Sequence, residues 1–335
     1  MDGKNLLSKY FDIQVEQVIQ DGGTSRYVSE GSLYTIIEAT KMEQKWLAEL
    51  HNMAEHLIKE GDKRASRFIP STEGRFLVNE EKKDYVVLKN QYKPASRSQT
   101  LGRRLARFHH RGRSIPVDLE ETSRIGKWKE LWGKRLDQLE EKVMQIIQNY
   151  PDEPIETLLI DAFPYYMGLA ENAIQYLVDT ELDEKPQIRD AGTICHERFT
   201  NETWNSTYGI REPFDWVFDH ASRDVAEWIR DAYWDRSLLY HSNKQNFLGQ
   251  YQSLQPLSAF SWRLIYARLL FPLHFFENVE NYYLTSSIQK KKMIEERLER
   301  MVKDTESYEK FLASFYDLAK VPIRKMNIPL VSWLR

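Results

Sequence analysis

The arrangement of apolar residues changes once along this 335-residue chain, close to Tyr92. Before that point, short segments rich in β-branched and aromatic residues lie between glycines or charged clusters, which is typical of antiparallel strands. We expect these strands at Arg26–Val28, Ser32–Ala39, Gly74–Val78 and Asp84–Lys89. Among them, Met42–Glu60 carries apolar residues with the period of an amphipathic helix. The first part of the chain therefore predicts a small sheet with a single helix.

Beyond Tyr92 the helical period dominates, and prolines separate the helical segments. Helices are expected at Gln99–His110, Ile125–Asn149, Ile155–Thr180, Ser222–Tyr233, Leu257–Asn281, Ser286–Asp304 and Thr305–Ala319. One stretch interrupts this pattern, because residues 187–216 are dense in polar side chains and indicate short strands or loops. Functional residues concentrate in loops held by a rigid scaffold, so this stretch is the first place to look for a site.

Charge balance and cysteine count exclude several classes of protein. With 47 Lys and Arg against 50 Asp and Glu, the net charge of −3 gives no general attraction for nucleic acid or an anionic bilayer. A single cysteine, Cys195, excludes an intrachain disulfide and a zinc site built from cysteines. The amino terminus lacks the apolar stretch of a signal peptide, and the densest apolar stretch, LLFPLHFF, is far below the roughly 20 residues of a membrane span. We therefore expect a protein made in the cytoplasm, with no signal peptide, no membrane span and no nucleic-acid partner.

Two pairs of neighbouring residues suggest metal or thiol chemistry, and each has a simpler explanation. His109 and His110 are adjacent on a predicted helix and point about 100° apart, so they cannot share one metal ion. Cys195 and His196 are neighbours on a predicted strand and face opposite sides of it. We expect one buried and one exposed histidine in the first pair, and a buried structural cysteine in the second.

Arginines gather between positions 97 and 113, and they are Arg97, Arg103, Arg104, Arg107, Arg111 and Arg113. Such a patch could bind phosphate or a polyanion. Because the whole chain is slightly acidic, we expect instead that those from Arg103 to Arg111 cover the solvated face of a helix. The other face of that helix carries Leu101, Leu105 and Phe108.

Acidic residues follow His196 at intervals that suggest a metal site. After His196 comes a polar turn, then Asp215 between apolar residues, and then Asp224. Carboxylates at the ends of paired short strands are one way in which a fold presents oxygen ligands to Mg²⁺ between nucleotide phosphates.

These motifs resemble those of the aminoglycoside phosphotransferase and choline-kinase-like family. Its linking helix carries L-G-x-x-L-A-x-h-H, where h is apolar, and this chain matches with Leu101, Gly102, Leu105, Ala106, Phe108 and His109. His196 stands at the start of the family's catalytic loop, Phe214–Trp216 at its metal-binding segment and Asp224–Ala226 at its D-L-A motif. The segment WRLIYARLLFPLHFFENVENYY is similar to the spore-coat-associated branch of the family.

The resemblance implies an α+β, protein-kinase-like fold with two lobes. The small antiparallel-sheet lobe would span residues 1–92, and the large helical lobe, with the catalytic loop, residues 93–335. It also implies a place in the spore coat, other spore coat proteins as partners, and structural roles for His109 and Asp224.

The catalytic loop departs from the family pattern H-G-D-x-x-x-x-N. Arg198 stands in place of the catalytic Asp, and a guanidinium has no acceptor with which to take a proton from an attacking hydroxyl. Thr203 stands in place of the metal-binding Asn, although Asn201 and Asn205 flank it. We expect Arg198 to pair with Asp215 or Glu197 and so to occupy the site.

The sheet lobe also lacks groups that the family uses. Its phosphate-binding lysine should lie in Ser32–Ala39, which contains no Lys. Glu49 stands where the glutamate partner of that lysine would be, and it would have no partner. The turn Asp21–Ser25 contains two glycines and is only a weak candidate for a phosphate-binding loop.

These departures favour a catalytically inactive kinase-fold protein, a binding or structural component of the endospore coat for which no cofactor is expected. One alternative is a divergent ATP-dependent phosphotransferase acting on a small hydroxyl or amino-sugar substrate, with Glu197 as base and Asp215 on the Mg²⁺ of Mg-ATP. Another is a helical interaction module whose surface is formed by the aromatic-rich carboxy-terminal helices.

Overall fold

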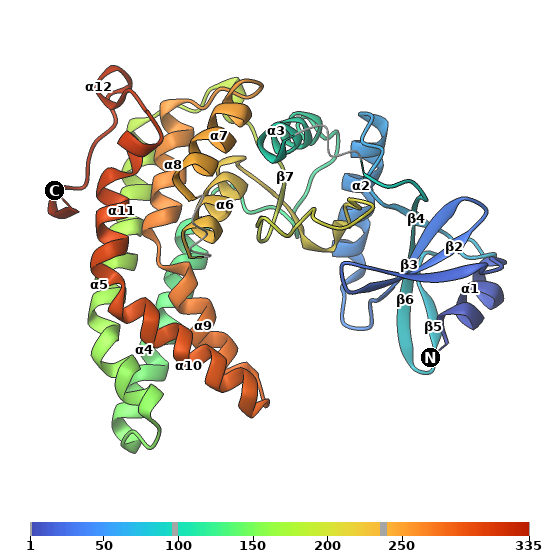
Figure 1. Cartoon of the computed structure of the whole chain (residues 1–335), viewed down its shortest axis with the longest axis horizontal. Helices are drawn as coiled ribbons and strands as arrows, with labels where there is room; N and C mark the ends of the chain where they lie inside the picture. Colours follow the sequence, from blue (N-terminus) through green and yellow to red (C-terminus); the bar gives the residue numbers. More distant parts are fainter. Residues whose placement is uncertain (1, 96–99, 235–239, 335) are drawn as a thin grey trace. The chain divides into compact units, whose positions relative to one another are not determined.

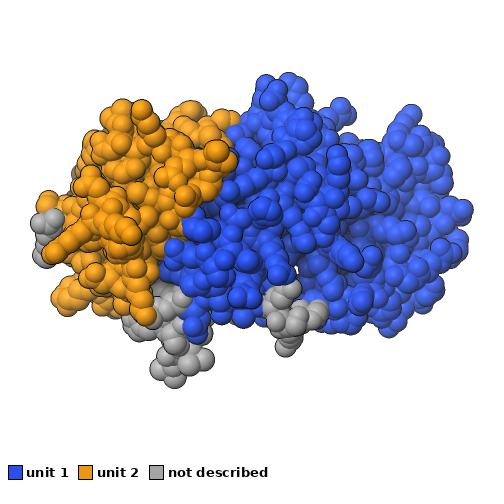
Figure 2. All heavy atoms as spheres, turned by 90° about the horizontal axis from the view of Figure 1, so that it is seen from above, with its two compact units in different colours: residues 1–124, 191–240, 246–256 blue, residues 125–190, 241–245, 257–335 orange. Residues whose placement is uncertain are grey.

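The computed structural model describes residues 2–95, 100–234 and 240–334. The chain forms two compact units (Figure 2): unit 1 holds residues 1–124, 191–240 and 246–256, and unit 2 holds residues 125–190, 241–245 and 257–335. The amino-terminal sheet and the polar stretch after residue 190 both belong to unit 1, so the candidate site is built within one unit.

Unit 1 contains an antiparallel sheet (Figure 1). Its strands pair in the order β1-β2-β3-β6-β4, and β5 pairs with β6. Their bounds are β1 (Gln17–Asp21), β2 (Thr24–Ser29), β3 (Ser32–Glu38), β4 (Arg67–Ile69), β5 (Val78–Glu80) and β6 (Lys83–Gln91). Helix α1 (Gly3–Phe11) precedes the sheet, and helix α2 (Gln44–Lys59) connects β3 to β4.

The two faces of the sheet are covered by different parts of the chain. On one face, Leu6, Leu7 and Phe11 of α1 pack against Tyr34 and Val87. Because side chains alternate along a strand, Leu33 points to the opposite face from Tyr34. There it packs with Val28 of β2 and with Ile210, which comes from the polar stretch far along the chain.

The remaining elements of unit 1 hold the polar stretch in place. Helix α3 (Leu101–Arg111) lies next to the hairpin of β7 (Thr193–His196) and β8 (Trp216–Asp219), which is followed by α6 (Ser222–Trp234) and α7 (Tyr240–Gln252). A single helical turn, Pro213–Asp215, leads directly into β8. In the hairpin, His196 is paired with Trp216.

Unit 2 is helical. It contains α4 (Trp128–Asn149), α5 (Pro154–Asp183), α8 (Ala259–Leu270), α9 (Leu273–Leu284), α10 (Ile288–Lys303), α11 (Thr305–Leu318) and α12 (Ile323–Met326), with short turns at Ile188–Asp190 and Ser332–Leu334. Stacked rings form much of its core, such as Trp132 on Phe271 and Tyr166 on Phe275, with centroids 4.6 and 3.6 Å apart. Among the described residues, no helix combines the length and the apolar character needed to cross a membrane.

Two expectations about secondary structure were wrong. The expected helix Leu257–Asn281 is two helices, because Pro272 cannot continue α8 and Phe271 before it is extended. The expected strand Gly74–Val78 is mostly a turn, in which the amide of Gly74 bonds to the carbonyl of Ser71. Elements α1, β1, β4 and α7 were not expected at all, and the expected helix start at Gln99 lies outside the described residues.

Candidate functional site

Asp224 joins two histidines in the buried centre of unit 1. Its Oδ1 accepts a hydrogen bond from the backbone amide of His196 at 2.9 Å. Its Oδ2 lies 2.7 Å from Nδ1 of His196 and 3.1 Å from Nε2 of His109. The other ring nitrogen of His109 is 2.8 Å from the hydroxyl of Tyr251. The cluster fixes the end of β7 to α3, α6 and α7.

The pKa values of this cluster follow from its charges. Burial alone would raise the pKa of Asp224, but the charge and hydrogen bonds of His196 and His109 hold it well below its ordinary value. Burial alone would lower the pKa of His196, but the charges of Asp224 and Asp215 raise it. The pKa of His109 is lowered, mainly by burial. The carboxylate of Asp224 is therefore the fixed negative charge around which the loop is built.

Cys195 is buried, His109 is buried and His110 is exposed, as expected.

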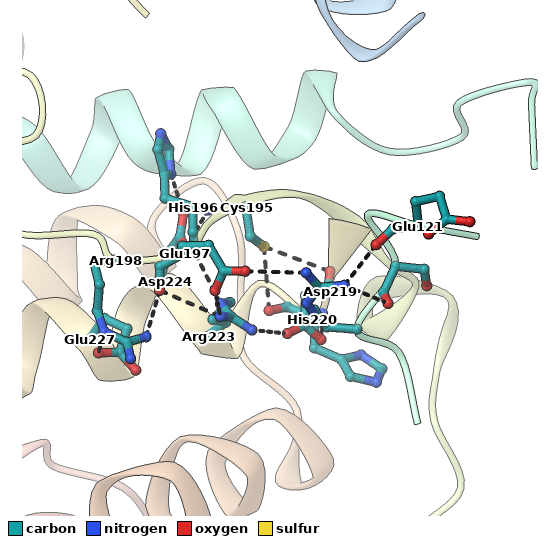
Figure 3. Close-up of polar contacts among 12 residues, drawn as sticks. Glu121, Cys195, His196, Glu197, Arg198, Asp219, His220, Arg223, Asp224 and Glu227 are labelled. Carbon is teal, nitrogen blue, oxygen red and sulfur yellow. Dashed lines mark hydrogen bonds and ion pairs between the residues drawn. The ribbon is translucent and has the colours of Figure 1, made fainter. Parts of the chain in front are cut away.

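Arg198, which stands in place of the catalytic Asp, turns toward α6 (Figure 3). Its Nε lies 3.8 Å from a carboxylate oxygen of the buried Glu227, and its Nη1 donates to the backbone carbonyl of Glu197 at 2.7 Å. The carboxylate of Glu197 instead contacts Arg223 and, at 3.4 Å, Arg124. We expected Arg198 to pair with Asp215 or Glu197; its described contact with Glu197 is to the backbone carbonyl, and it also lies near the buried carboxylate of Glu227.

A cavity of about 470 Å³ opens beside the loop within unit 1. Its lining consists of Asp21, Gly22, Thr24, Arg26, His196, Glu202, Thr203, Trp204, Asn205, Ser206, Ile210, Arg211, Glu212, Phe214, Asp215 and Trp216. Of the residues expected in the catalytic loop and metal-binding segment, His196, Thr203, Asn205 and Asp215 therefore meet at this cavity, together with Asp21, Gly22 and Thr24 of the turn that was a weak candidate for phosphate binding. The other expected residues of the catalytic loop, which are Glu197, Arg198 and Asn201, do not line it.

The loop residues near the expected metal position have other partners. Oδ1 of Asn201 accepts a hydrogen bond from Nε1 of Trp228 at 2.7 Å. The hydroxyl of Thr203 accepts one from the amide of Thr200 at 2.8 Å, and the side-chain amide of Asn205 donates to Glu202 at 2.9 Å. The amide oxygen of Asn201 is therefore already used within the protein.

Asp215 lines the cavity, and its carboxylate has no side-chain or backbone partner in another described residue. No hydrogen bond or ion pair joins its side chain to another described residue, whereas its backbone carbonyl accepts from the amide of Glu197. Burial raises the pKa of Asp215 to about 6, against the charge of His196, which lowers it. An unpaired, desolvated carboxylate of this kind is common at functional sites.

A cation that the sequence analysis missed lies on the cavity side of the sheet. Arg26 of β2 donates from Nη1 to the hydroxyl of Thr35 on β3 at 2.6 Å and also contacts Glu212. Its Nε is 3.8 Å from Asp21. Arg26 thus lies beside β3, the strand in which the family's lysine was expected. The sequence does indicate this position: Arg26 lies two residues before Val28 on the expected strand, so the two side chains share one face of the strand.

Glu49 does not face the cavity. Its carboxylate accepts hydrogen bonds from the backbone amides of residues 120–122, at 2.8 to 3.0 Å, and from the hydroxyl of Thr122 at 2.6 Å. Although burial alone would raise it, the pKa of Glu49 is lowered by these hydrogen bonds. Glu49 therefore anchors the segment after α3 to α2.

The expectation that the arginines of α3 cover a solvated face is only half right. Arg103 and Arg107 are exposed. Arg111 forms an ion pair with the buried Asp62 at 3.3 Å, and the guanidinium of Arg104 lies over the ring of Trp204, 5.4 Å from its centroid. Two of the four arginines from Arg103 to Arg111 therefore contact the protein interior, Arg111 at Asp62 and Arg104 at Trp204. Arg97 lies outside the described residues.

Residues 205–212, called here the 205–212 loop, pack against the face of the sheet that carries Val28 and Leu33. The carbonyl of Thr207 accepts from the amide of Ala95 at 2.9 Å, and the amide of Thr207 donates to Asp21 at 2.8 Å. Tyr208 and Ile210 contact the apolar cluster of Val28 and Leu33. The loop is therefore tied to the sheet by both apolar and polar contacts.

Comparisons with known proteins identify the family. The sequence model of the family described as "Spore coat putative kinase YutH" matches residues 4–315. The chain is 42% identical to the endospore coat-associated protein YutH of Bacillus subtilis over 332 residues, which is 99% of this chain and 98% of that protein.

Solved structures share the fold at low sequence identity. An aminoglycoside phosphotransferase from Alicyclobacillus acidocaldarius superposes with a TM-score of 0.64 at 14% identity, covering 92% of this chain and 94% of that one. A spectinomycin phosphotransferase, solved in complex with ADP and spectinomycin, gives a TM-score of 0.56 at 12% identity, covering 91% and 97%. The expected fold and family resemblance are both confirmed: the chain has the aminoglycoside phosphotransferase-like fold and belongs to the YutH family of spore coat kinase-like proteins.

Proposed function

We propose that this chain is a catalytically inactive, kinase-fold component of the endospore coat, which binds other molecules instead of phosphorylating them. Its likeness to the endospore coat-associated YutH extends over 99% of its length and supports a place in the coat, with other coat proteins as partners. A fluorescent fusion that stays in the mother cell and never reaches the spore surface would contradict that placement.

One observation carries the proposed inactivity: the 205–212 loop packs against the face of the sheet that carries Val28 and Leu33. In protein kinases the glycine-rich hairpin of the sheet covers the phosphates of the nucleotide, so the nucleotide lies on this side of the sheet. Here Ile210 is 7% exposed and packs against Val28 and Leu33, with Tyr208 beside them. A nucleoside would have to displace these apolar contacts.

The polar groups of the segment after β6 are also engaged. The carbonyls of Lys93 and Pro94 accept hydrogen bonds from the guanidinium of Arg64, at 2.6 and 2.9 Å. Arg64 also donates to the carbonyl of Tyr208 at 2.9 Å, and the amide of Ala95 donates to Thr207. Backbone groups that could bind a base at this edge thus already have partners in the 205–212 loop and in Arg64.

The chemistry of the loop supports the same proposal. Phosphoryl transfer depends on positioning and on charge stabilisation by metal ions, a lysine and a loop carboxylate. Arg198 offers no proton acceptor and is directed to Glu227. Arg26, which lies beside β3, is shared among Thr35, Glu212 and Asp21. These residues do not fit Mg-ATP in the manner of an active kinase.

The alternative, a divergent phosphotransferase for a small hydroxyl or amino-sugar substrate, is favoured by Asp215. Its carboxylate faces the cavity with no partner among the described residues and could bind a cation. Against this alternative, Glu197, its expected base, contacts two arginines and does not line the cavity.

The two functions are separated by thermal unfolding with adenosine and with Mg-ATP. A ligand that binds only the native state raises the midpoint, and about 100-fold excess over Kd corresponds to roughly 2.7 kcal/mol. We expect no shift with adenosine and no transfer or hydrolysis of ATP. A shift with Mg-ATP that is lost in Asp215→Ala and kept in the exposed control Asp317→Ala, together with turnover, would establish the phosphotransferase instead.

A further inference from the structure

A second cavity, called here the α2 pocket, lies within unit 1 between α2 and the sheet, and its volume is about 280 Å³. Its lining consists of Gln44, Leu47, Ala48, His51, Asn52, Phe68, Phe76, Leu77 and Val86. None of these described residues also lines the larger cavity beside the catalytic loop. The two cavities are neighbours, because the ring of Phe68 in the α2 pocket lies 5.8 Å from that of Phe214 in the larger cavity. The α2 pocket is therefore a separate site.

The α2 pocket exists because one edge of the sheet is interrupted. Strand β4 pairs with residues 87–89 of β6, and β5 pairs with residues 83–85 of the same edge. Val86 lies between these segments and has no described partner on that edge, because residues 70–77 leave the sheet. Its two neighbours in β6 pack with α1, and side chains alternate along a strand, so Val86 points to the opposite face. Helix α2, which lies beside β4 (Figure 1), covers that face and leaves the space open.

Three rings form one wall of the α2 pocket. The ring centroid of His51 is 4.8 Å from that of Phe76 and 5.7 Å from that of Phe68. The rings of Phe68 and Phe76 are 6.4 Å apart and nearly perpendicular. Phe76 is 39% exposed, so a ligand can reach its ring. Aromatic rings attract one another at these distances, and a further ring can therefore pack against this wall.

The polar groups at the α2 pocket favour a neutral ligand. Its described lining residues include no acid, lysine or arginine, so an ion would lose its hydration there without gaining an opposite charge. The side chains of Gln44 and Asn52 are exposed, and no hydrogen bond joins either of them to another residue in the described ranges. A side-chain amide can both donate and accept, so each can bind one polar group of a ligand.

The size of the α2 pocket limits the ligand further. A cavity of roughly 150 Å³ is enough for benzene, so this pocket has room for one or two rings. Its lining on α2 extends only from Gln44 to Asn52, about 12 Å of helix, which is short for a peptide with several anchoring side chains. We propose that the α2 pocket binds a small, neutral aromatic molecule of one or two rings, with a hydrogen-bonding group toward Gln44 or Asn52.

The test is calorimetric titration of the full chain with indole, which is neutral and carries one N–H donor. We expect saturable binding with a Kd of about 0.1–1 mM. Cyclohexanol, which has a hydrogen-bonding group but no aromatic ring, should bind at least several fold more weakly. Equal binding of the two compounds would contradict the assignment of an aromatic ligand.

Two variants locate the binding site. Ala48→Leu adds three carbons at an exposed position of α2 and should weaken indole binding on the order of tenfold by filling the pocket. Its matched control is Ala313→Leu, at an exposed position of α11 in unit 2, which should bind indole like the unaltered chain. Phe76→Leu keeps an apolar side chain in the wall but removes the ring, and it should weaken binding several fold. The proposal is overturned if indole gives no saturable heat, or if neither Ala48→Leu nor Phe76→Leu weakens its binding.

Discussion

Asp224 holds His196 twice, through the backbone amide at 2.9 Å and through Nδ1 of the ring at 2.7 Å. The two contacts fix both the position of the loop after β7 and the orientation of the imidazole. Nδ1 faces Asp224, and Nε2 is buried without a partner among the described residues. Asp224 thus holds the start of the loop in place in a chain whose loop carries Arg198 where the acid was expected.

Asp224→Asn should be strongly destabilising. The substitution keeps the shape but removes the charge on which His196 and His109 depend, and breaking a buried ionic cluster costs about 3 kcal/mol. Denaturant unfolding measures the effect. The exposed control Glu306→Gln, which breaks only the i,i+4 pair with Lys310, should change the free energy of unfolding by less than about 0.5 kcal/mol. Equal effects in the two variants would show that the cluster does not hold the loop.

Asp215→Asn should stabilise the protein at neutral pH. The folded state raises the pKa of Asp215 to about 6 from 3.8, so its contribution to stability is fully present below pH 3.8 and is lost as the pH rises through 6. Removing the ionisable group should raise the free energy of unfolding by about 2 kcal/mol at pH 7.5. The charges of His196, Asp224 and Glu212 also affect the pKa of Asp215. The variant and the unaltered chain are therefore compared at the same pH. A gain as large at pH 4 as at pH 7.5 would contradict the explanation.

Arg198→Asp should not restore nucleotide binding. Arg198 does not line the cavity, and the new carboxylate would lie near Glu227 on α6, where like charges repel. We expect a lower thermal midpoint, equivalent to about 1–3 kcal/mol, and no new response to Mg-ATP. Arg103→Asp, on the exposed face of α3, is the matched control and should be nearly neutral. A new Mg-ATP response would mean that Arg198 blocks the site after all.

Two glycine substitutions should have opposite signs. A Cβ on Gly102 of α3 would lie 2.4 Å from the backbone carbonyl of Phe247 on α7, so Gly102→Ala should cost about 1–3 kcal/mol. A Cβ on Gly133 of α4 meets nothing within 4 Å, so Gly133→Ala should stabilise the helix by about 0.5–1 kcal/mol. Calorimetric midpoints would reveal both effects, and a neutral Gly102→Ala would show that α3 and α7 pack less closely.

Strong local periodicity is what made parts of the fold predictable. Strand β3 and helix α2 have clear apolar patterns, and both were expected within a few residues of their observed bounds. Helix α7 and strand β4 were missed, because a polar helix and a three-residue strand owe their form to tertiary contacts. The break at Pro272 was visible in the sequence but was read as lying within one helix.

The site was predictable only where a motif marks it. His196, Asp215 and Asp224 were found because their order and spacing match a family. Arg211 was not singled out, since its place at the cavity depends on how the 205–212 loop folds. The contact of Arg198 with Glu227 was missed for a similar reason: nothing in the sequence placed Glu227 beside it.

The contact between Ile210 and the strands at Val28 and Leu33 also has a consequence for how the protein forms on the ribosome. The sheet emerges first, but its underside stays open to solvent until the much later segment with Tyr208 and Ile210 has been synthesised. Until then an apolar surface and the free backbone amide of Ala95 are accessible to chaperones or to other chains. An amino-terminal fragment that ends at the sheet should therefore aggregate, and maturation of the sheet has to wait for the rest of unit 1.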